Sequence, residues 1–470
     1  MRMPTIKLFQ VLIVASLLIP LQLALPMEWQ ASLVSAAWAD DDDDGDDGDD
    51  GDDDDDDDQM GQSTGGSGNG RASSWKNPLG SLLRRLTDTP QPAEPAPPPA
   101  RVVLPSRAPA EVVVSDASTE DIEQLLSEGF AVLATENLGA FNQVLTRLTT
   151  PTDLTLEAAR DRVRALPSVS TADFNHYYRF EQGETNVAVS APCLHENCAA
   201  WDIIQWPDIT KASDTCSVRV PVGMIDTGIN SDHEIMAAAQ LDLIKLSDQS
   251  LEPSKATHGT AVASLMIGNP NSRVPGLIHD AKIIAVDVFS RRGSDERADL
   301  VSLLRGLDAL KARGVRVINL SLSGPENSLL EEAVNQLVQQ DGIVLVAAAG
   351  NAGPSGKPAF PAAYEPVLAV TAVDARARIY RQAQRGAHID LTAPGVNMLS
   401  ATSIRGARLK SGTSFAVPFV TAAVALLLSQ DETLSPEQVR EFLRQSARDL
   451  GSPGVDEVFG AGLLNAASLC

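Results

Sequence analysis

The sequence predicts an α/β protein built on a doubly wound parallel sheet, preceded by a small α+β domain. From residue 218 onward, short strands that are apolar throughout alternate with helical patterns. Such strands are typically buried on both faces, as in parallel sheets covered by helices. Upstream, residues 111–181 carry the order βαββαβ, which is the split ferredoxin-like pattern. We therefore expect two folded domains, at 111–181 and 218–470.

The small domain is expected to alternate strands with two helices. Apolar residues at helical spacing, such as Ile122, Leu125 and Leu126, indicate the helices. Runs rich in β-branched and aromatic residues between turn-forming residues indicate the strands. The expected strands cover residues 111–115, 130–139, 142–150 and 169–180, and the expected helices cover residues 119–129 and 154–166.

The large domain shows strands and helices in regular alternation. A late helix is marked by Ser435 as N-cap, Pro436 at the first helical position and Gln438 as capping-box partner. Because right-handed crossovers gather the carboxyl ends of parallel strands at one edge, ligands are expected there. The expected strands cover 218–226, 282–289, 315–323, 343–350 and 367–373, and helices are expected from His258, at 296–314, at 328–340 and from Ser414.

Length and composition allow a large core, and the charge needs a correction. The chain has 470 residues, of which 43% are hydrophobic, and its formal net charge is −25. Sixteen aspartates lie between Asp40 and Asp58, and without them the charge is −9. A modest acidic balance without a basic patch favours solubility and argues against nucleic acid as a partner.

The first 110 residues carry no pattern of a folded domain. Basic residues precede a long apolar run, and a small-x-small pattern at 37–39 follows it, so residues 1–39 are predicted to be a signal peptide. A retained membrane anchor is the alternative, but Pro20 and Pro26 interrupt the run. We expect an exported protein, periplasmic or secreted, with no stable membrane span after signal removal. Residues 40–110 are Asp-rich, then Gly/Ser-rich and Pro-rich, and are expected to be a disordered linker.

Four cysteines fit an oxidising compartment. They allow three pairings, which the sequence does not decide. Our hypothesis is Cys193–Cys198, because these two share a short loop, together with Cys216–Cys470, which would tie the ends of the large domain together. His195 lies between the first two cysteines, but two Cys and one His without a second cluster make a poor four-ligand metal site. No metal site is therefore assigned.

Four polar residues stand at the ends of apolar elements. Asp226 ends a strand, His258 and Ser414 begin helices, and Asn351 follows a buried strand and a glycine. An isolated serine before an apolar run is usually an N-cap, but the other residues change this interpretation. A serine becomes a nucleophile when an imidazole takes its proton and a carboxylate orients that imidazole. An amide N–H can stabilise the oxyanion that forms. This chemistry requires no cofactor.

These stretches resemble the subtilisin-like serine peptidases. The resemblance covers roughly residues 218–467, and it implies a catalytic triad of Asp226, His258 and Ser414 with Asn351 as oxyanion donor. It also implies that residues 111–181 are an inhibitory propeptide that acts as the enzyme's own partner, and that 182–217 contain the processing site. The chemistry of the acidic tract leaves structural calcium possible but unassigned, because no acidic group matches a defined calcium loop.

The resemblance also implies where an extended peptide would bind. The strand edge would be Ser321, Leu322 and Ser323, recognised mainly through main-chain hydrogen bonds. Ser323 stands where the family usually has glycine, and its side chain is expected to narrow the groove. No acidic residue is visible in the pocket, so an apolar residue before the cleaved bond is favoured over a basic one. The expected pocket walls are Ala348, Ala349, Gly350 and Ala359.

The sequence thus predicts an exported serine endopeptidase that is made as a self-processed zymogen and acts on protein or peptide substrates. The alternative is a catalytically inactive protein of the same fold that serves in binding or surface adhesion. A catalytically inactive member of the family would have little reason to keep the four polar residues described above at the ends of strands and helices.

Overall fold

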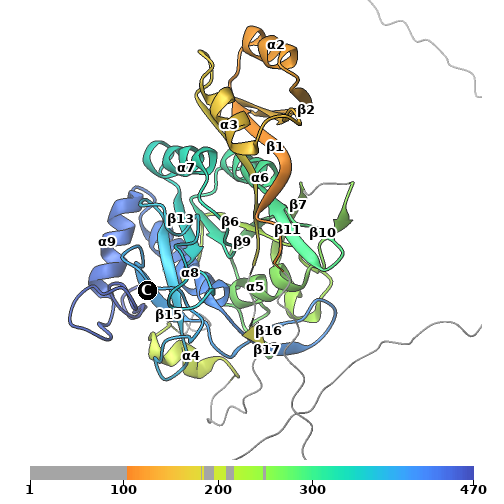
Figure 1. Ribbon diagram of the computed structural model, residues 1–470. Helices are drawn as coiled ribbons and strands as arrows, with labels where there is room; N and C mark the ends of the chain where they lie inside the picture. The colour runs from red at the N-terminus through yellow and green to blue at the C-terminus, as the bar shows by residue number, and fades with distance from the viewer. Residues whose placement is uncertain (1–102, 181–182, 185–194, 208–215, 247–249) are drawn as a thin grey trace, which may run out of the picture. The chain divides into compact units, whose positions relative to one another are not determined.

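A computed structural model describes residues 103–180, 183–184, 195–207, 216–246 and 250–470 (Figure 1). They all belong to one compact unit, Pro98–Cys470. The expected signal peptide, most of the expected linker, most of the expected processing segment and Cys193 lie outside the described residues.

The small N-terminal domain has the predicted order βαββαβ. Its strands form an antiparallel sheet in the order β2-β3-β1-β4. The side chains of Ser118 and Thr155 cap its two helices. Its first strand begins at Arg107, a few residues before the predicted start, because the Arg107 backbone pairs with His176. The elements are β1 (Arg107–Ser115), α2 (Thr119–Ser127), β2 (Ala131–Leu138), β3 (Gln143–Thr149), α3 (Leu156–Arg164) and β4 (Thr171–Tyr178).

The large domain contains the predicted parallel sheet. Its seven strands lie in the order β15-β14-β13-β12-β6-β9-β7, and all neighbours are parallel. β6 lies between β9 and β12, where the direction of winding reverses. The strands are β6 (Val222–Asp226), β7 (Gln240–Lys245), β9 (Lys282–Asp287), β12 (Val317–Leu320), β13 (Val344–Ala348), β14 (Leu368–Val373) and β15 (Leu391–Pro394).

Helices cover both faces of this sheet, as a doubly wound fold requires. α5 (Thr257–Ile267) and α8 (Val417–Gln430) pack on one face, and α6 (Leu300–Ala312) and α7 (Ser328–Asn335) pack on the other. Neighbouring residues of one strand enter different cores: Met224 lies in the first and Ile225 in the second. Because successive side chains alternate across a strand, a strand buried on both sides must be apolar throughout.

Some predicted boundaries were wrong. The helix expected at 296–314 begins only at Leu300, because Asp295–Asp299 form strand β11 and the Asp299 side chain accepts from the N–H of Ser302. The helix expected to end at residue 340 becomes a π-helical turn, Gln336–Gln340. Ser414 lies in a 3-10 turn, Thr413–Phe415, which precedes α8.

Several elements were not predicted. Their sequences are short or strongly polar, so their pairing depends on neighbours that are distant in the chain. They are β7, β11 and β15, whose bounds are given above, together with α4 (Cys198–Ile203), η2 (Glu234–Met236), β5 (Gly183–Glu184), β8 (Glu252–Pro253), β10 (Ser290–Arg292), β16 (Met398–Ala401) and β17 (Ala407–Ser411). The late helix marked by the capping box is α9 (Pro436–Ser446), and its capping box is formed.

The small domain packs on α6 and α7 of the large domain (Figure 1). The Asp308 carboxylate of α6 accepts from the N–H of Ala140 at 2.7 Å. The Asp173 carboxylate of β4 accepts from the N–H of Ser328, the first residue of α7, at 2.9 Å. Acidic groups suit such a helix start, where backbone N–H groups lack partners.

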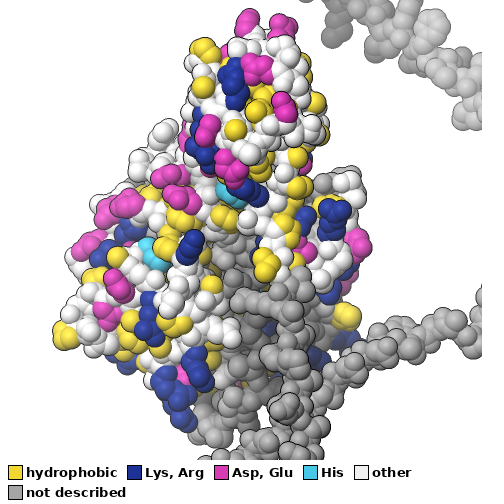
Figure 2. Space-filling model, in the orientation of Figure 1, with side chains coloured by type: hydrophobic (Ala, Val, Ile, Leu, Met, Phe, Trp, Pro, Cys, Tyr) yellow, Lys and Arg dark blue, Asp and Glu magenta, His cyan; other side chains and the backbone are white. Residues whose placement is uncertain are grey.

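Neither the charges on the protein surface nor the long apolar helix indicates a particular binding partner. On the face shown in Figure 2, acidic and basic side chains lie interspersed over the described residues. Among the described helices, only Thr413–Gln430 is long and apolar enough to cross a membrane, and 94% of this segment is buried inside the protein.

A disulfide joins Cys216 to Cys470, as predicted. Its two half-cystines are separated by 254 residues, and it closes the large domain end to end. The predicted partner of Cys198, Cys193, lies outside the described residues, so that pair stays a prediction.

Removing the long disulfide should destabilise the large domain. A bridge that closes a long loop restricts the unfolded chain, and its loss typically costs about 2–4 kcal/mol. We expect Cys216→Ser with Cys470→Ser to lower the urea midpoint accordingly, measured in a Ser414→Ala background to prevent proteolysis. An unchanged midpoint would contradict this assignment of the bridge's role.

Candidate active site

The four predicted polar residues lie at one edge of the parallel sheet. Asp226 is the last residue of β6, and Asn351 follows the end of β13. His258 lies in the first turn of α5, and Ser414 lies in the turn before α8. The carboxyl ends of the strands and the starts of the following helices therefore gather residues from distant parts of the chain.

Asp226 and His258 form a buried hydrogen-bonded pair. The distance from His258 Nδ1 to Asp226 Oδ1 is 2.7 Å, and the side chains are 0% and 3% exposed, respectively. The same carboxylate oxygen accepts from the N–H of Thr227 at 2.7 Å. A carboxylate at Nδ1 favours the tautomer that leaves Nε2 to accept a proton.

Gly259 lets α5 approach the end of β6. A Cβ at this position would lie 2.7 Å from the carbonyl oxygen of Gly228, closer than real Cβ atoms lie. The N–H of Gly259 donates to Thr227 Oγ1 at 2.8 Å, which fixes the first helical turn on the Asp226-Thr227 turn. The glycine after the histidine is therefore needed for the position of His258.

Ser414 is held by the end of β12. Its Oγ donates to the carbonyl of Ser321 at 3.1 Å, and Ser321 Oγ donates to the carbonyl of Ser414 at 2.8 Å. Among the described residues His258 Nε2 has no hydrogen-bond partner, so the bond from Ser414 to His258 is not formed in this state. A hydrogen bond from Ser414 to His258 would require the Ser414 hydroxyl to turn away from the Ser321 carbonyl.

A buried polar chain supports Ser321, and sequence reasoning did not find it. Asn319 Nδ2 donates to Ser321 Oγ at 3.0 Å, and Thr421 Oγ1 donates to Asn319 Oδ1 at 3.2 Å. All three side chains are buried. Thr421 lies two helical turns after Ser414, a spacing that could have marked it as a partner on the same helix face.

Asn351 is oriented by the residue before Ser414. Its Oδ1 accepts from both the N–H and the hydroxyl of Thr413, at 3.0 Å each. With its oxygen held in this way, the amide must donate through Nδ2. That is the group an oxyanion donor needs.

The predicted pocket residues lie together, next to a residue that was missed. Ala348, Ala349 and Ala359 are buried, and Gly350 has φ of 101° and donates to Thr413 Oγ1. A Cβ at Gly350 would collide with the Gln384 side chain, whose amide N–H donates to the carbonyl of Lys357. Gln384 comes from a loop with no motif, so nothing in the sequence placed it here.

An extended segment of the small domain occupies the predicted substrate edge. Arg179 and Ser323 form an antiparallel pair in which each N–H donates to the other's carbonyl at 2.8 Å. Ser323 therefore does not prevent strand pairing. Phe180 stacks on the His258 ring with centroids 4.5 Å apart and an interplanar angle of 19°. Phe415, on the nucleophile turn, also lies beside that ring, at 5.6 Å.

A second carboxylate lies next to Asp226. Asp287, the last residue of β9, is in register with Asp226. Burial raises the pKa of Asp287 to about 6, although it accepts from Phe289 N–H and Ser254 Oγ. The charge of Asp226 adds to the rise. Asp287 was not singled out from the sequence.

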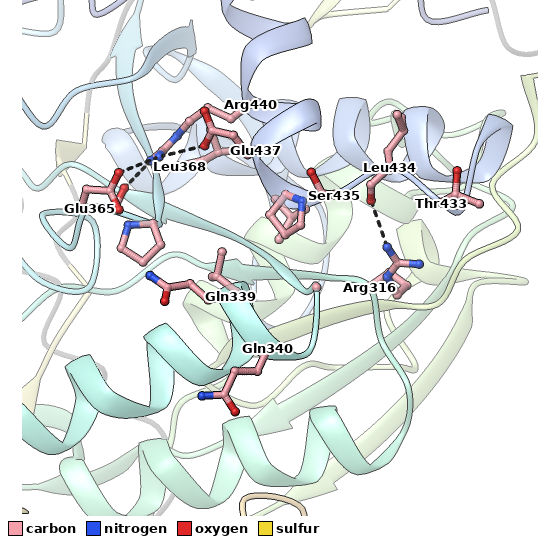
Figure 3. Close-up of a pocket in the computed structure, with 15 residues that line it drawn as sticks. Arg316, Gln339, Gln340, Glu365, Leu368, Thr433, Leu434, Ser435, Glu437 and Arg440 are labelled. Atoms are coloured by element: carbon pink, nitrogen blue, oxygen red, sulfur yellow. Dashed lines mark hydrogen bonds and ion pairs between the residues drawn. The ribbon is translucent and has the colours of Figure 1, made fainter.

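A separate cavity of about 520 Å³ lies at the opposite edge (Figure 3). Val344 and Leu368, the first residues of β13 and β14, line it. Its arginines are engaged: Arg316 donates to the carbonyl of Leu434, and Arg440 pairs with carboxylates. None of the predicted site residues lines this cavity, so it is distinct from the candidate active site.

Within the part of the chain that the structure describes, no three His, Cys, Asp or Glu side chains are grouped so as to hold a metal ion.

The fold and this arrangement define a class, the serine peptidases built on a doubly wound sheet. The model of the subtilase family matches residues 218–462. The chain therefore belongs to the subtilase family.

Known relatives agree with this assignment. Subtilisin DY from Bacillus licheniformis is 35% identical over 266 residues, which are 55% of this chain and 93% of that protein. An alkaline protease from Alkalihalobacillus alcalophilus is 31% identical over 358 residues, which are 75% of this chain and 88% of that protein. The minor extracellular protease Epr from Bacillus subtilis (strain 168) is 33% identical, but this chain spans only 41% of its length.

One solved structure shows the same fold. Fervidolysin from Fervidobacterium pennivorans, a keratinolytic enzyme related to subtilisin, is similar with a TM-score of 0.63 at 19% identity. The similarity covers 78% of this chain and 62% of fervidolysin.

Neutralising Asp287 should stabilise the fold at neutral pH. Because the pKa of Asp287 is raised in the folded state, the native protein binds more protons than the unfolded chain. The contribution of Asp287 to the free energy of unfolding therefore falls as pH rises from about 4 to about 6. We expect Asp287→Asn to raise stability at pH 7 by about 1–3 kcal/mol and to have little effect near pH 4. Thermal unfolding at both pH values, with exposed Asp153→Asn as control, measures this. A loss of stability at pH 7 would contradict the argument.

Proposed function

We propose that this protein is an exported serine endopeptidase made as a zymogen, with Asp226, His258 and Ser414 as its triad. The observation that carries the proposal is the buried 2.7 Å bond from Asp226 to His258, at the sheet edge that also holds Ser414 and Asn351. Family membership supports the reaction class.

In the proposed reaction, Ser414 Oγ attacks the carbonyl carbon of the scissile bond. His258 Nε2 takes the hydroxyl proton and later gives it to the leaving amine, while Asp226 stabilises the imidazolium. Water then repeats the sequence on the acyl ester and releases the acid. This requires the Ser414 hydroxyl to leave the Ser321 carbonyl, which it contacts at 3.1 Å in the present state.

The oxyanion would be stabilised by Asn351 Nδ2 and the Ser414 backbone N–H. Donors fixed before the reaction cost no reorganisation when charge develops. The two bonds from Thr413 to Asn351 Oδ1 support such a fixed donor. No cofactor is required for this chemistry.

The small domain is proposed to be the inhibitory propeptide. Its last strand continues into the substrate edge, where Arg179 pairs with Ser323 and Phe180 covers the His258 ring. The alkaline protease relative aligns with 75% of this chain, a larger share than residues 218–470 make up, so the similarity reaches into the N-terminal part. Export is supported by the apolar N-terminal run and by the Cys216–Cys470 disulfide.

The alternative is an inactive protein of the same fold used for binding or adhesion. It predicts that Ser414 can be replaced without consequence, and for adhesion that deleting residues 40–110 abolishes function. The buried Asp226–His258 pair gives the endopeptidase the advantage, because such a pair serves proton transfer.

Replacing Ser414 should abolish processing and labelling together. The exported chain should lose its N-terminal part by self-cleavage and react with a serine-directed fluorophosphonate, whereas Ser414→Ala should do neither. Gel mobility, intact mass and label intensity give the result. If the wild-type chain stays whole and unlabelled in its purified form, the peptidase assignment fails.

Replacing Asn351 should slow the chemical step more than binding. Losing one oxyanion donor costs about 10²–10³ in kcat. We expect Asn351→Ala to lower kcat by that factor and to change KM little, measured with a chromogenic peptide on processed enzyme. A comparable rise in KM with unchanged kcat would place Asn351 in substrate binding instead.

A further inference from the structure

We propose that Asp295 is a specificity-determining residue, and that the enzyme prefers substrates with arginine at the third position before the cleaved bond. This inference rests on the proposed endopeptidase function and names a preference of the same site. It is drawn from two contacts of Arg179: its backbone pairs with Ser323 of the substrate edge, and its side chain binds Asp295.

The position of Arg179 follows from strand register. Arg179 and Ser323 form a hydrogen-bonded antiparallel pair. In an antiparallel ladder such pairs recur every two residues, and one strand advances while the other runs back. The partner of Ser321 is therefore the residue two positions after the partner of Ser323. Ser321 is the residue whose carbonyl contacts the nucleophile Ser414. A residue opposite Ser321 would present its carbonyl to Ser414, which makes the Ser323 partner the third residue before the cleaved bond.

A second anchor agrees with this register. On the other side, Gly183 pairs with Ser411, three residues before the nucleophile. The chain therefore approaches Ser414 from both flanks, with Phe180 beside His258 on one side and Gly183 beside β17 on the other.

Asp295 recognises the arginine side chain through two bonds. Arg179 Nε lies 2.7 Å from Asp295 Oδ1, and an Nη lies 2.9 Å from Oδ2. Asp295 is 8% exposed, and the Arg179 side chain is 22% exposed. Such bidentate pairing uses the planar guanidinium, which lysine cannot match. Arg179 also donates to the carbonyl of Pro105, a contact that a separate peptide would not have.

Asp295 belongs to the large domain, and its backbone pairs there with Arg292 of β10. It begins β11, and Arg297 on the same strand also contacts its carboxylate. Burial alone would raise the pKa of Asp295, but Arg179 and Arg297 hold that pKa below its usual value. The carboxylate is thus ionised while it binds both arginines, and Arg297 would still contact it when a peptide takes the place of Arg179.

The residue before Arg179 also fits closely against the substrate edge. Tyr178 is fully buried, and a Cβ at Gly324 would collide with its ring, so the absence of a side chain at Gly324 makes room for the ring.

The test is a substitution cycle between enzyme and peptide. Processed wild-type enzyme and Asp295→Asn would each cleave quenched peptides based on residues 178–183, carrying Arg, Lys or Gln at the second position. A bond to a charged group is worth about 1.5–3 kcal/mol, so the Arg peptide should exceed the Gln peptide about 10- to 100-fold in kcat/KM with wild type. The ratio should fall near one with Asp295→Asn. Glu296→Gln, on the same strand, is the matched control and should keep the ratio.

Reversing the charge at position 295 separates a loss of recognition from misfolding, because a misfolded variant would not gain a new preference. Asp295→Arg should lose preference for the Arg peptide and gain preference for one with Glu in that place. Equal cleavage of Arg and Gln peptides by an active, fluorophosphonate-labelled enzyme would overturn this inference and leave the endopeptidase proposal intact. An unlabelled protein that cuts no peptide would overturn both.

Discussion

The bond between Asp226 and His258 is the interaction on which the rest of the site depends. It joins the end of β6 to the first turn of α5, across 32 residues of chain. The bond forms because Gly259 allows the helix to touch the turn after Asp226. Every other site residue is placed relative to this pair.

The sheet also explains how the nucleophile is held. Ser414 is attached through Ser321 to the end of β12, the strand beside β6, while Asn351 follows β13, the next strand along. Thr413 links Asn351 to the same turn. Neighbouring strands thus supply the carboxylate, the support of the proposed nucleophile and the proposed oxyanion donor in that order. A shift of one strand would disturb all three.

The sequence was sufficient for what depends on local pattern. Asp226, His258, Asn351 and Ser414 stand at element ends that apolar periodicity marks clearly, and the βαββαβ order follows from the same periodicity. The missed features depend on partners. Asp295–Asp299 has four charged residues in five and becomes a strand because β4 and β10 pair with it on either side.

Side-chain partners were harder still to predict. Thr421 bonds to Asn319, and Gln384 fills the space beside Gly350, from positions with no motif of their own. Their roles arise from where the backbone places them, and a single sequence does not encode that placement in a local signal. For the same reason a capping role for Asp173 on α7 was not expected.

Strand pairing accounts for how one cleft could serve both an inhibitor and a substrate. Tyr178, Arg179 and Phe180 alternate in direction along the strand, so the first and third face Gly324 and His258 while the second meets Asp295. A peptide substrate can reproduce these contacts but not those of Asp173 and Asp308 between the small domain and the two surface helices. The added contacts would let the small domain remain bound after its link is cut, whereas a cleaved peptide, held by the groove alone, would leave.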